Sequence, residues 1–261
     1  MSLVIENTPE KYSFSKLSSW WTCPLGYKMR YIEHQTGEGN AFSSYGSFVH
    51  GIMERYANGE LPLDSLPSVY EWEFESAVPE KFPPNKYADL HDTYYRQGLE
   101  FLKSFSGYDS YEILGVEEKF EIQIDDWVFV GVIDLVYRDE QGRLIIHDYK
   151  SKSGFKNDAE LKKYLRQLYL YSIYVKQKFG QYPYMLKFLT FRKQTSVDTL
   201  FDEESACEAL DWAKKTVDII RNAIDYPATC DEFFGDYLCN HRNYCPLKPK
   251  KQYTYKSKRK G

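Results

Sequence analysis

The sequence lacks the features that mark several large classes of protein. No apolar run approaches the roughly 20 residues of a transmembrane helix. The N-terminus carries no signal-peptide pattern, so we expect the protein to be cytoplasmic. Only 5 of the 261 residues are cysteine, which points away from a disulfide framework. Also absent are an internal repeat and the Gly-x-x-x-x-Gly-Lys-Ser/Thr loop of ATPases. The sequence therefore indicates neither a membrane-spanning protein nor an ATP-driven motor.

The chain does have enough apolar and aromatic residues to form a large hydrophobic core. Hydrophobic residues make up 43% and aromatic residues 17%, enough for one large domain, which we place at residues 1–247. The net charge is −4, but Lys248 to Gly261 holds seven basic residues and no acid, which leaves 27 basic against 38 acidic residues elsewhere. This basic tail, residues 248–261, is either a flexible solvated end or a contact for a phosphate backbone.

A β-hairpin predicted at residues 127–150 is the most informative stretch of the chain. Its strands, residues 127–137 and 143–150, are dense in β-branched and aromatic residues. Because successive side chains of a strand alternate, Asp148 and Lys150 point to the same side of the sheet. The second strand therefore presents a carboxylate and an ammonium group together.

The turn of this hairpin decides where Asp134 points. A three-residue loop with Gly142 in the left-handed conformation pairs Asp139 with Arg143. Asp134 then sits opposite Asp148 on the same face, whereas a two- or four-residue loop would turn it to the other face. Gly142 favours the three-residue loop. Buried carboxylates need a partner, and hard divalent cations bind carboxylate oxygens, so we predict a metal site on the hairpin.

Helices and further strands are predicted on both sides of the hairpin. Ser13 can cap a helix that runs to about residue 33 and bends or splits at Cys23-Pro24. The remaining helices are expected at residues 41–57, 69–77, 87–105, 158–179 and 202–223, and the remaining strands at 112–124, 182–193 and 196–201. Residues 1–12 show no regular pattern. These elements predict an α/β fold.

Polar side chains at helical spacing could join the hairpin site. Ser47, His50 and Glu54 fall on one stripe of the 41–57 helix. Gln167 and Tyr171 lie four residues apart, and therefore on one face of the 158–179 helix.

Two further ionisable residues lie on the predicted strands. Glu118 shares a strand face with apolar neighbours and should point inward, where it is either paired or a further metal ligand. His147 should face away from Asp148, and we interpret it as structural.

The order of these pieces resembles the RecB-like branch of the PD-(D/E)XK nuclease superfamily, close to phage-type exonucleases and CRISPR-associated relatives. The similarity covers residues 13–245 and rests on motifs that are weak singly but specific in this order. They are Ser13-Phe14-Ser15-Lys16-Leu17 with Cys23-Pro24, Gly46-Ser47-Phe48-Val49-His50, Gly131-Val132-Ile133-Asp134, Asp148-Tyr149-Lys150, and Gln167 to Tyr171. The resemblance implies a restriction-endonuclease-like core: a central mixed sheet flanked by helices, with a helical N-terminal part and a Cys-containing C-terminal segment.

The resemblance also implies a metal-dependent site for phosphodiester hydrolysis. One or two Mg²⁺ or Mn²⁺ ions would lower the pKa of the attacking water and clamp the reacting oxygens. The implied ligands are His50, Asp134, Asp148 and the Tyr149 carbonyl. Lys150 would orient or deprotonate the water and stabilise charge at phosphorus. Gln167 and Tyr171 would position the scissile phosphate or the Lys150 ammonium.

Each of these residues also has a plainer interpretation. Taken alone, His50 on a helix face would be a core histidine. Gln167 and Tyr171 could simply pack their helix on the sheet.

The cysteines resemble part of an iron–sulfur motif. Relatives with such a cluster combine one Cys in the N-terminal helix with a C-terminal Cys-x2-Cys-x5-Cys. Cys23 matches the first, and Cys239 with Cys245 gives the Cys-x5-Cys pair, but position 236 is Asp. Cys230 could take the missing place, so that four thiolates bind a 4Fe–4S cluster. Zinc at the same place or simple packing are the alternatives, and Cys207 is expected to be buried in its helix.

We therefore expect a metal-dependent DNA exonuclease that acts in DNA end processing or recombination, with a possible recombination or helicase partner. A non-catalytic DNA-binding or structural member of the fold is one alternative, and a flap or single-strand endonuclease is another. The presence of Asp134, Asp148 and Lys150 together argues against the first. Strand polarity, single- against double-strand preference and oligomeric state stay open at this point.

Overall fold

The computed structural model describes residues 9–246, so residues 1–8 and 247–261, which include the predicted basic tail, lie outside the described residues. One mixed six-stranded sheet forms the centre and confirms the expected α/β fold. The strands are β1 (Lys11–Ser13), β2 (Glu112–Ile124), β3 (Trp127–Arg138), β4 (Leu144–Lys150), β5 (Met185–Thr190) and β6 (Thr195–Leu200). The helices are α1 (Phe14–Thr22), α2 (Pro24–Tyr27), α3 (Ala41–Ala57), α4 (Leu66–Ala77), α5 (Leu90–Ser104), α6 (Asp158–Phe179) and α7 (Glu203–Arg221). Short 3₁₀ or π-helical turns add Leu63–Ser65, Lys28–Ile32 and Phe234–Leu238.

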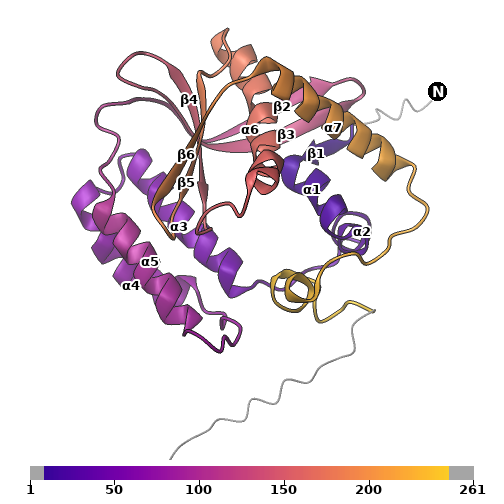
Figure 1. Ribbon diagram of the computed structural model, residues 1–261, viewed down its shortest axis with the longest axis horizontal. Coiled ribbons are helices and arrows are strands. Elements are labelled where there is room, and N and C mark those ends of the chain that lie inside the picture. Colours follow the sequence, from indigo (N-terminus) through magenta and orange to yellow (C-terminus); the bar gives the residue numbers. More distant parts are fainter. Residues whose placement is uncertain (1–8, 247–261) are drawn as a thin grey trace, which may run out of the picture.

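The helices cover the sheet on both faces (Figure 1). Helices α3, α4 and α5 lie on one side, where aromatic side chains such as Tyr45, Tyr70 and Phe74 build a core against β4. Helices α1, α6 and α7 lie on the other side, over a second core that includes Phe129 and Phe188. Burying both faces of the central strands explains why β3 and β4 read as nearly continuous apolar runs.

Strand β3 has different neighbours along its two edges. Antiparallel β2 accompanies almost its whole length, from Ile124–Trp127 to Glu112–Arg138. On the other edge, β1 runs parallel to residues 128–130, and β4 runs antiparallel to residues 135–138. Within the described part of the chain, residues 131–134 therefore have no partner strand on that edge. The sheet opens at the Gly131-Val132-Ile133-Asp134 motif.

The predicted hairpin register is confirmed. Leu135 pairs with His147 and Arg138 with Leu144, the register that the three-residue loop requires. The pairing ends at Leu135 and His147, so the strands have already parted at Asp134 and Asp148. At the turn, the Asp139 N–H donates to the Arg143 carbonyl over 3.1 Å. Gly142 has φ +72°, the left-handed conformation that the three-residue loop requires.

The N-terminal segment differs from the prediction in one respect. Ser13 does cap a helix, because its Oγ accepts from the Lys16 N–H at 3.1 Å, and the helix does split at Cys23-Pro24. Residues 11–13, however, form β1 rather than part of a patternless lead. Three residues carry too little periodicity to predict a strand, and β1 exists only because β3 pairs with it.

None of the helices described between residues 9 and 246 combines the length and the apolar character that a membrane crossing requires.

His147 faces away from Asp148, as predicted, and is buried among aromatic rings. Its side chain packs against Tyr108, Tyr137 and Tyr149 and is 2% exposed. Neither ring nitrogen has a hydrogen-bond partner among the described residues. Burial, helped by the charge of Lys187, lowers the pKa of His147 to about 3. The imidazole is therefore neutral in the folded protein at any pH near 7.

Replacing His147 with Phe should reduce the loss of unfolding free energy as the pH falls below 6.5. Between pH 6.5 and 3, the unfolded state binds a proton that the folded state excludes, so stability falls as the pH drops through that window. The slope from one such group is about 1.4 kcal/mol per pH unit. In urea unfolding at pH 6.5 and 4.5, we expect the His147→Phe variant to lose about 2–3 kcal/mol less than the parent. Equal losses in the variant and the parent would contradict this assignment.

Candidate active site

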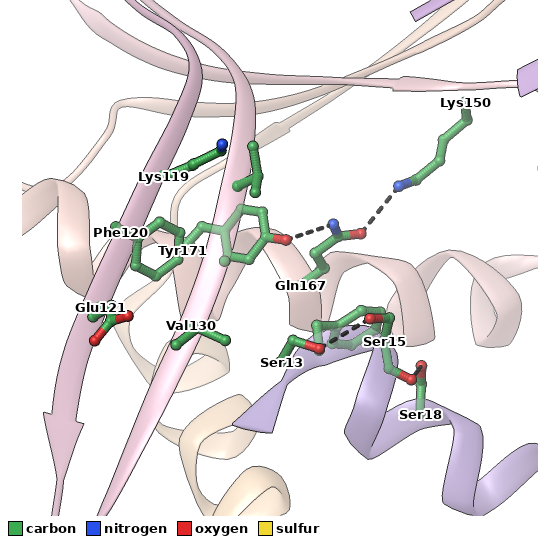
Figure 2. Close-up of a pocket in the computed structure, with 13 residues that line it drawn as sticks. Ser13, Ser15, Ser18, Lys119, Phe120, Glu121, Val130, Lys150, Gln167 and Tyr171 are labelled. Atoms are coloured by element: carbon green, nitrogen blue, oxygen red, sulfur yellow. Dashed lines mark hydrogen bonds between the residues drawn. The ribbon is translucent and has the colours of Figure 1, made fainter. Parts of the chain in front are cut away.

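A cleft of about 750 Å³ lies where the sheet opens. Its walls come from the end of β1, the start of α1, β2, β3, the end of β4 and one face of α6. Figure 2 shows the side chains of Lys150, Gln167 and Tyr171 on one side and Ser13, Ser15 and Ser18 of the N-terminal segment on the other. Three of the predicted site residues therefore meet in one cleft.

A chain of polar contacts runs from β4 to α6 inside this cleft. Lys150 Nζ lies 2.6 Å from Asp148 Oδ2 and donates to Gln167 Oε1 at 3.0 Å. Gln167 Nε2 in turn donates to the Tyr171 hydroxyl at 2.9 Å. The ammonium group is thus held between the Asp148 carboxylate on β4 and the Gln167 amide on α6, and Figure 2 shows the contact with Gln167. Gln167 therefore contacts the Lys150 ammonium, which is the contact that one of its two predicted roles requires.

Gly131 makes room for this arrangement. A Cβ atom at that position would come within 2.9 Å of the Tyr171 ring and 2.5 Å of Phe120. Those two rings already pack edge-to-face, with centroids 5.2 Å apart. Only glycine therefore allows α6 to bring Tyr171 down onto β3, which explains the residue that opens the Gly131–Asp134 motif.

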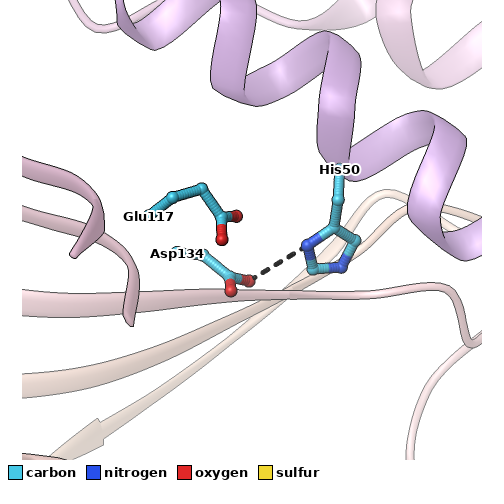
Figure 3. A group of neighbouring side chains, drawn as sticks. All are labelled: His50, Glu117 and Asp134. Carbon is cyan, nitrogen blue, oxygen red and sulfur yellow. Dashed lines mark ion pairs between the residues drawn. The ribbon is translucent and has the colours of Figure 1, made fainter. Parts of the chain in front are cut away.

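A second group of side chains gathers around Asp134 (Figure 3). His50 from α3 points toward it, with Nδ1 3.4 Å from Asp134 Oδ2. Glu117 from β2 lies beside both, and one ligand atom from each of the three lies within 4.8 Å of the others. Asp134 Oδ2 also accepts the Tyr149 N–H at 2.8 Å. That bond replaces the ladder hydrogen bond that β4 loses where the sheet opens.

The electrostatics of this group favour a cation. Burial raises the pKa of Asp134 well above its ordinary value, and the charge of Asp148 raises it further. Burial also raises the pKa of Glu117, with help from the charges of Glu54 and Asp148. For His50, burial lowers the pKa, so the imidazole is neutral and can donate a lone pair. Desolvated carboxylates that repel one another are stabilised when a divalent ion joins them.

The donor set fits a hard divalent metal ion. Two carboxylates and a neutral imidazole suit Mg²⁺ or Mn²⁺. His50 and Asp134, predicted as ligands, belong to the group. Asp148 lies outside it and pairs with Lys150, although its charge influences His50, Asp134 and Glu117. The Tyr149 backbone lies within hydrogen-bonding distance of His50, the position expected of its carbonyl.

Of the two roles weighed for Glu118, the structure favours the paired one, and the carboxylate beside Asp134 belongs to Glu117. Glu118 does point to the α6 side, as alternation predicted, but it accepts from the Tyr174 hydroxyl at 2.5 Å and pairs with Lys178. Glu117 has φ +46°, an unusual conformation for a residue other than glycine, and its carboxylate lies beside His50 of α3. Alternation already puts Glu117 on the face opposite Glu118, so the sequence held a signal that the prediction did not use.

Two of the predicted cluster cysteines meet although they are 207 residues apart in sequence. Burial alone would raise the pKa of the Cys23 thiol, but hydrogen bonds from the backbone of Gly26, Thr229 and Cys230 and from the Cys230 side chain lower it below the usual value. The Thr229 hydroxyl donates to the Thr22 carbonyl and holds the segments together. Cys207 is exposed on α7 rather than buried, which corrects the expectation for it.

The remaining cysteines lie on the same C-terminal segment. Cys239 and Cys245 are both half-buried. Among residues 9–246, no cysteine joins a group of three ligand atoms as compact as the one around Asp134.

A mixed sheet with acidic residues at its opening and a lysine beside them defines a restriction-endonuclease-like fold. The sequence profile of the PD-(D/E)XK nuclease superfamily matches residues 11–249, and the chain belongs to this superfamily. Within it, the matching profile is that of the RecB-like family.

One solved structure supports the fold, and a second is reported for comparison. The structure of a candidate exonuclease from Eubacterium rectale aligns with this chain at a TM-score of 0.50 and 15% sequence identity. The alignment covers 95% of this chain and 96% of the exonuclease chain. The structure of SSO0001 aligns at a TM-score of 0.41 and 16% sequence identity. That alignment covers 93% of this chain and 89% of the SSO0001 chain. No curated protein matches the sequence.

Glu117 and Glu118 offer a matched pair of variants for the metal site. Glu117→Gln removes a carboxylate from the group around Asp134, so we expect Mn²⁺ affinity to fall about tenfold or more. Glu118→Gln should leave Mn²⁺ affinity within about twofold, because Glu118 pairs with Lys178 instead. Isothermal titration with Mn²⁺ measures both. A larger loss in the Glu118 variant than in the Glu117 variant would refute the assignment.

Proposed function

We propose that this protein is a metal-dependent DNA exonuclease that hydrolyses phosphodiester bonds during DNA end processing or recombination. The observation that supports it most strongly is the Lys150 ammonium between Asp148 and Gln167, next to the acidic group around Asp134. Such a combination suits attack of water on a phosphate, where a metal and a cation must both face the developing charge. Membership of the nuclease superfamily supports the same reaction class.

The chain's own residues would divide the work. A Mg²⁺ or Mn²⁺ ion bound by His50, Glu117 and Asp134, with Asp148 and the Tyr149 carbonyl as further ligands, would supply an activated water and charge neutralisation. Lys150 would hold the water or a non-bridging phosphate oxygen through its ammonium group. Gln167 keeps Lys150 in place, and Tyr171 keeps Gln167 in place, so both act as positioning residues. Of the three N–H donors of the ammonium, Asp148 and Gln167 take two, and the third would be available to the phosphate.

We also propose the setting of the enzyme. Residues 1–247 would act as a single nuclease domain in the cytoplasm, and the basic tail at 248–261 would add phosphate contacts at DNA ends. A recombination or helicase protein would deliver those ends.

The C-terminal segment would in addition hold a 4Fe–4S cluster. Cys23 and Cys230 already lie together, and N–H groups directed at the Cys23 sulfur are typical of thiolates that bind a cluster. Cys239 and Cys245 would complete the set. The cluster would join α1 and α2 to the C-terminal segment, and it takes no part in hydrolysis.

Substitutions at Lys150 separate a nuclease from a DNA-binding protein. On labelled linear DNA with Mg²⁺ or Mn²⁺, we expect the parent to release nucleotides from ends and EDTA to stop the release. Lys150→Ala should lower the cleavage rate by about 10²-fold or more, a typical loss for a group that stabilises transition-state charge. Gln167→Ala should lower it less, because it removes only the support of Lys150.

The controls for this experiment distinguish the alternatives. Lys103→Ala, on the surface of α5, should cleave at the parental rate. Binding of DNA by the parent without any cleavage would instead support the inactive, DNA-binding alternative, and release of internal fragments from circular single strands would support an endonuclease.

The proposed cluster predicts a coloured protein. Purified without air, the parent should be brown, absorb near 400 nm and contain about four iron atoms per chain. Cys230→Ser should remove the colour, whereas Cys207→Ser on α7 should keep it. A colourless, iron-free parent after reconstitution with iron and sulfide would refute the cluster and leave the nuclease proposal intact.

A further inference from the structure

A second groove continues the active-site cleft along α1. It has a volume of about 590 Å³ and lies between α1, α6 and α7. Phe14 and Ser18 line both the cleft and the groove, so the two are contiguous. Tyr164 lines the groove, and its ring centroid is 5.6 Å from the Lys150 ammonium. A ligand that occupies the cleft can therefore extend into the groove.

The walls of the groove carry cations without acidic partners. Lys163 and Arg166 on α6 line it, and neither makes an ion pair with any carboxylate in the described part of the chain. No Asp or Glu lines the groove. On a protein with a net charge of −4, this local excess of positive charge suits a polyanion.

The groove also presents flat aromatic surface. Trp21 is 55% exposed, and its indole N–H donates to the Thr216 hydroxyl on α7 at 3.0 Å, which fixes the ring. Trp212 forms the opposite wall, between Phe14 at 5.8 Å and the Arg166 guanidinium at 5.1 Å. An exposed tryptophan held rigid beside unpaired cations is unexplained by the packing of α1, because the apolar side of that helix is already buried through Leu17 and Trp20.

We propose that this groove binds the single-stranded continuation of a DNA strand whose phosphate lies in the active site, with one base stacked on Trp21 and phosphates on Lys163 and Arg166. The inference rests on the proposed nuclease function and specifies its substrate as a single strand. Stacking needs the open face of a base, which a duplex does not offer. Helix α1, nine residues long, spans about 13 Å, so the stacked base lies only a few nucleotides from the scissile phosphate.

Binding measured in EDTA tests the groove without cleavage. The probe is a fluorescein-labelled 12-nucleotide oligo(dT), followed by anisotropy, with a blunt duplex of the same length for comparison. Trp21→Ala should weaken oligo(dT) binding about fivefold or more, and the ratio of single-strand to duplex affinity should fall by the same factor. Trp21→Phe, which keeps a ring, should stay within about twofold of the parent. Equal oligo(dT) affinity in Trp21→Ala and the parent would overturn the proposal.

Matched controls come from the opposite side of the sheet. Trp72 on α4 is 87% exposed, and Trp72→Ala should bind like the parent. Lys163→Gln should lower the slope of log affinity against log salt by about 0.7, the release expected from one phosphate contact on a single strand, while Lys103→Gln on α5 should not. If Trp72→Ala weakens binding as much as Trp21→Ala, the groove is not the site.

A cleavage assay with Mg²⁺ separates this proposal from the one on which it rests. If the parent cleaves no DNA but Trp21→Ala still loses oligo(dT) affinity in EDTA, the nuclease proposal is wrong and the proposal for the groove is supported. If the parent cleaves DNA and its affinity for oligo(dT) does not depend on Trp21, the proposal for the groove is wrong and the nuclease proposal is supported.

Discussion

The burial of like charges where β3 and β4 part is the constraint on which the site depends. Asp134 and Asp148 lie close enough for the charge of Asp148 to raise the pKa of Asp134, and Glu117 adds a third carboxylate. Burial, which removes the water that would screen these charges, raises the pKa of Asp134 and of Glu117, and the charge of Asp148 raises both further. The protein offsets part of it with the Lys150 ammonium and the Tyr149 N–H. Negative charge that these two groups do not neutralise remains, and a divalent ion is suited to neutralise it.

The same opening determines the shape of the substrate path. Because β1 is only three residues long, it leaves β3 before the Asp134 motif and passes directly into α1. The N-terminal end of α1 therefore stands at the cleft, and the rest of the helix leads away from it toward Trp21. A longer β1 would continue to pair with β3 and close the opening. The short first strand thus links the metal-binding group to the groove on α1, α6 and α7.

Much of this could be predicted from the sequence, because it depends on local rules. The hairpin register follows from Gly142 and the length of the turn, and the placing of Gln167 and Tyr171 on one face follows from helical spacing. The features that could not be predicted depend on long-range pairing or on an unusual backbone. Glu117 has a positive φ within β2, and which of the two neighbouring glutamates lies beside Asp134 depends on how β2 packs against α3. Likewise, Cys230 meets Cys23, and Trp21 and Trp212 come to line one groove, only once α1 has docked against the C-terminal half of the chain.

These long-range contacts have a consequence for how the site forms. His50 comes from α3, Glu117 from β2, Asp134 from β3, Lys150 from β4 and Gln167 from α6, so no local fragment contains the whole arrangement. Helices α3 and α6 lie on opposite faces of the sheet, and the two halves of the site meet only at the opening between the strands (Figure 1). Residues on rigid elements are held more precisely than residues on loops, and here nearly every proposed functional side chain lies on a helix or a strand. The charge-bearing groups are therefore brought together only when both helical layers have packed on the sheet. The electrostatic repulsion among the carboxylates thus arises only in the folded protein, where packing of both layers offsets it.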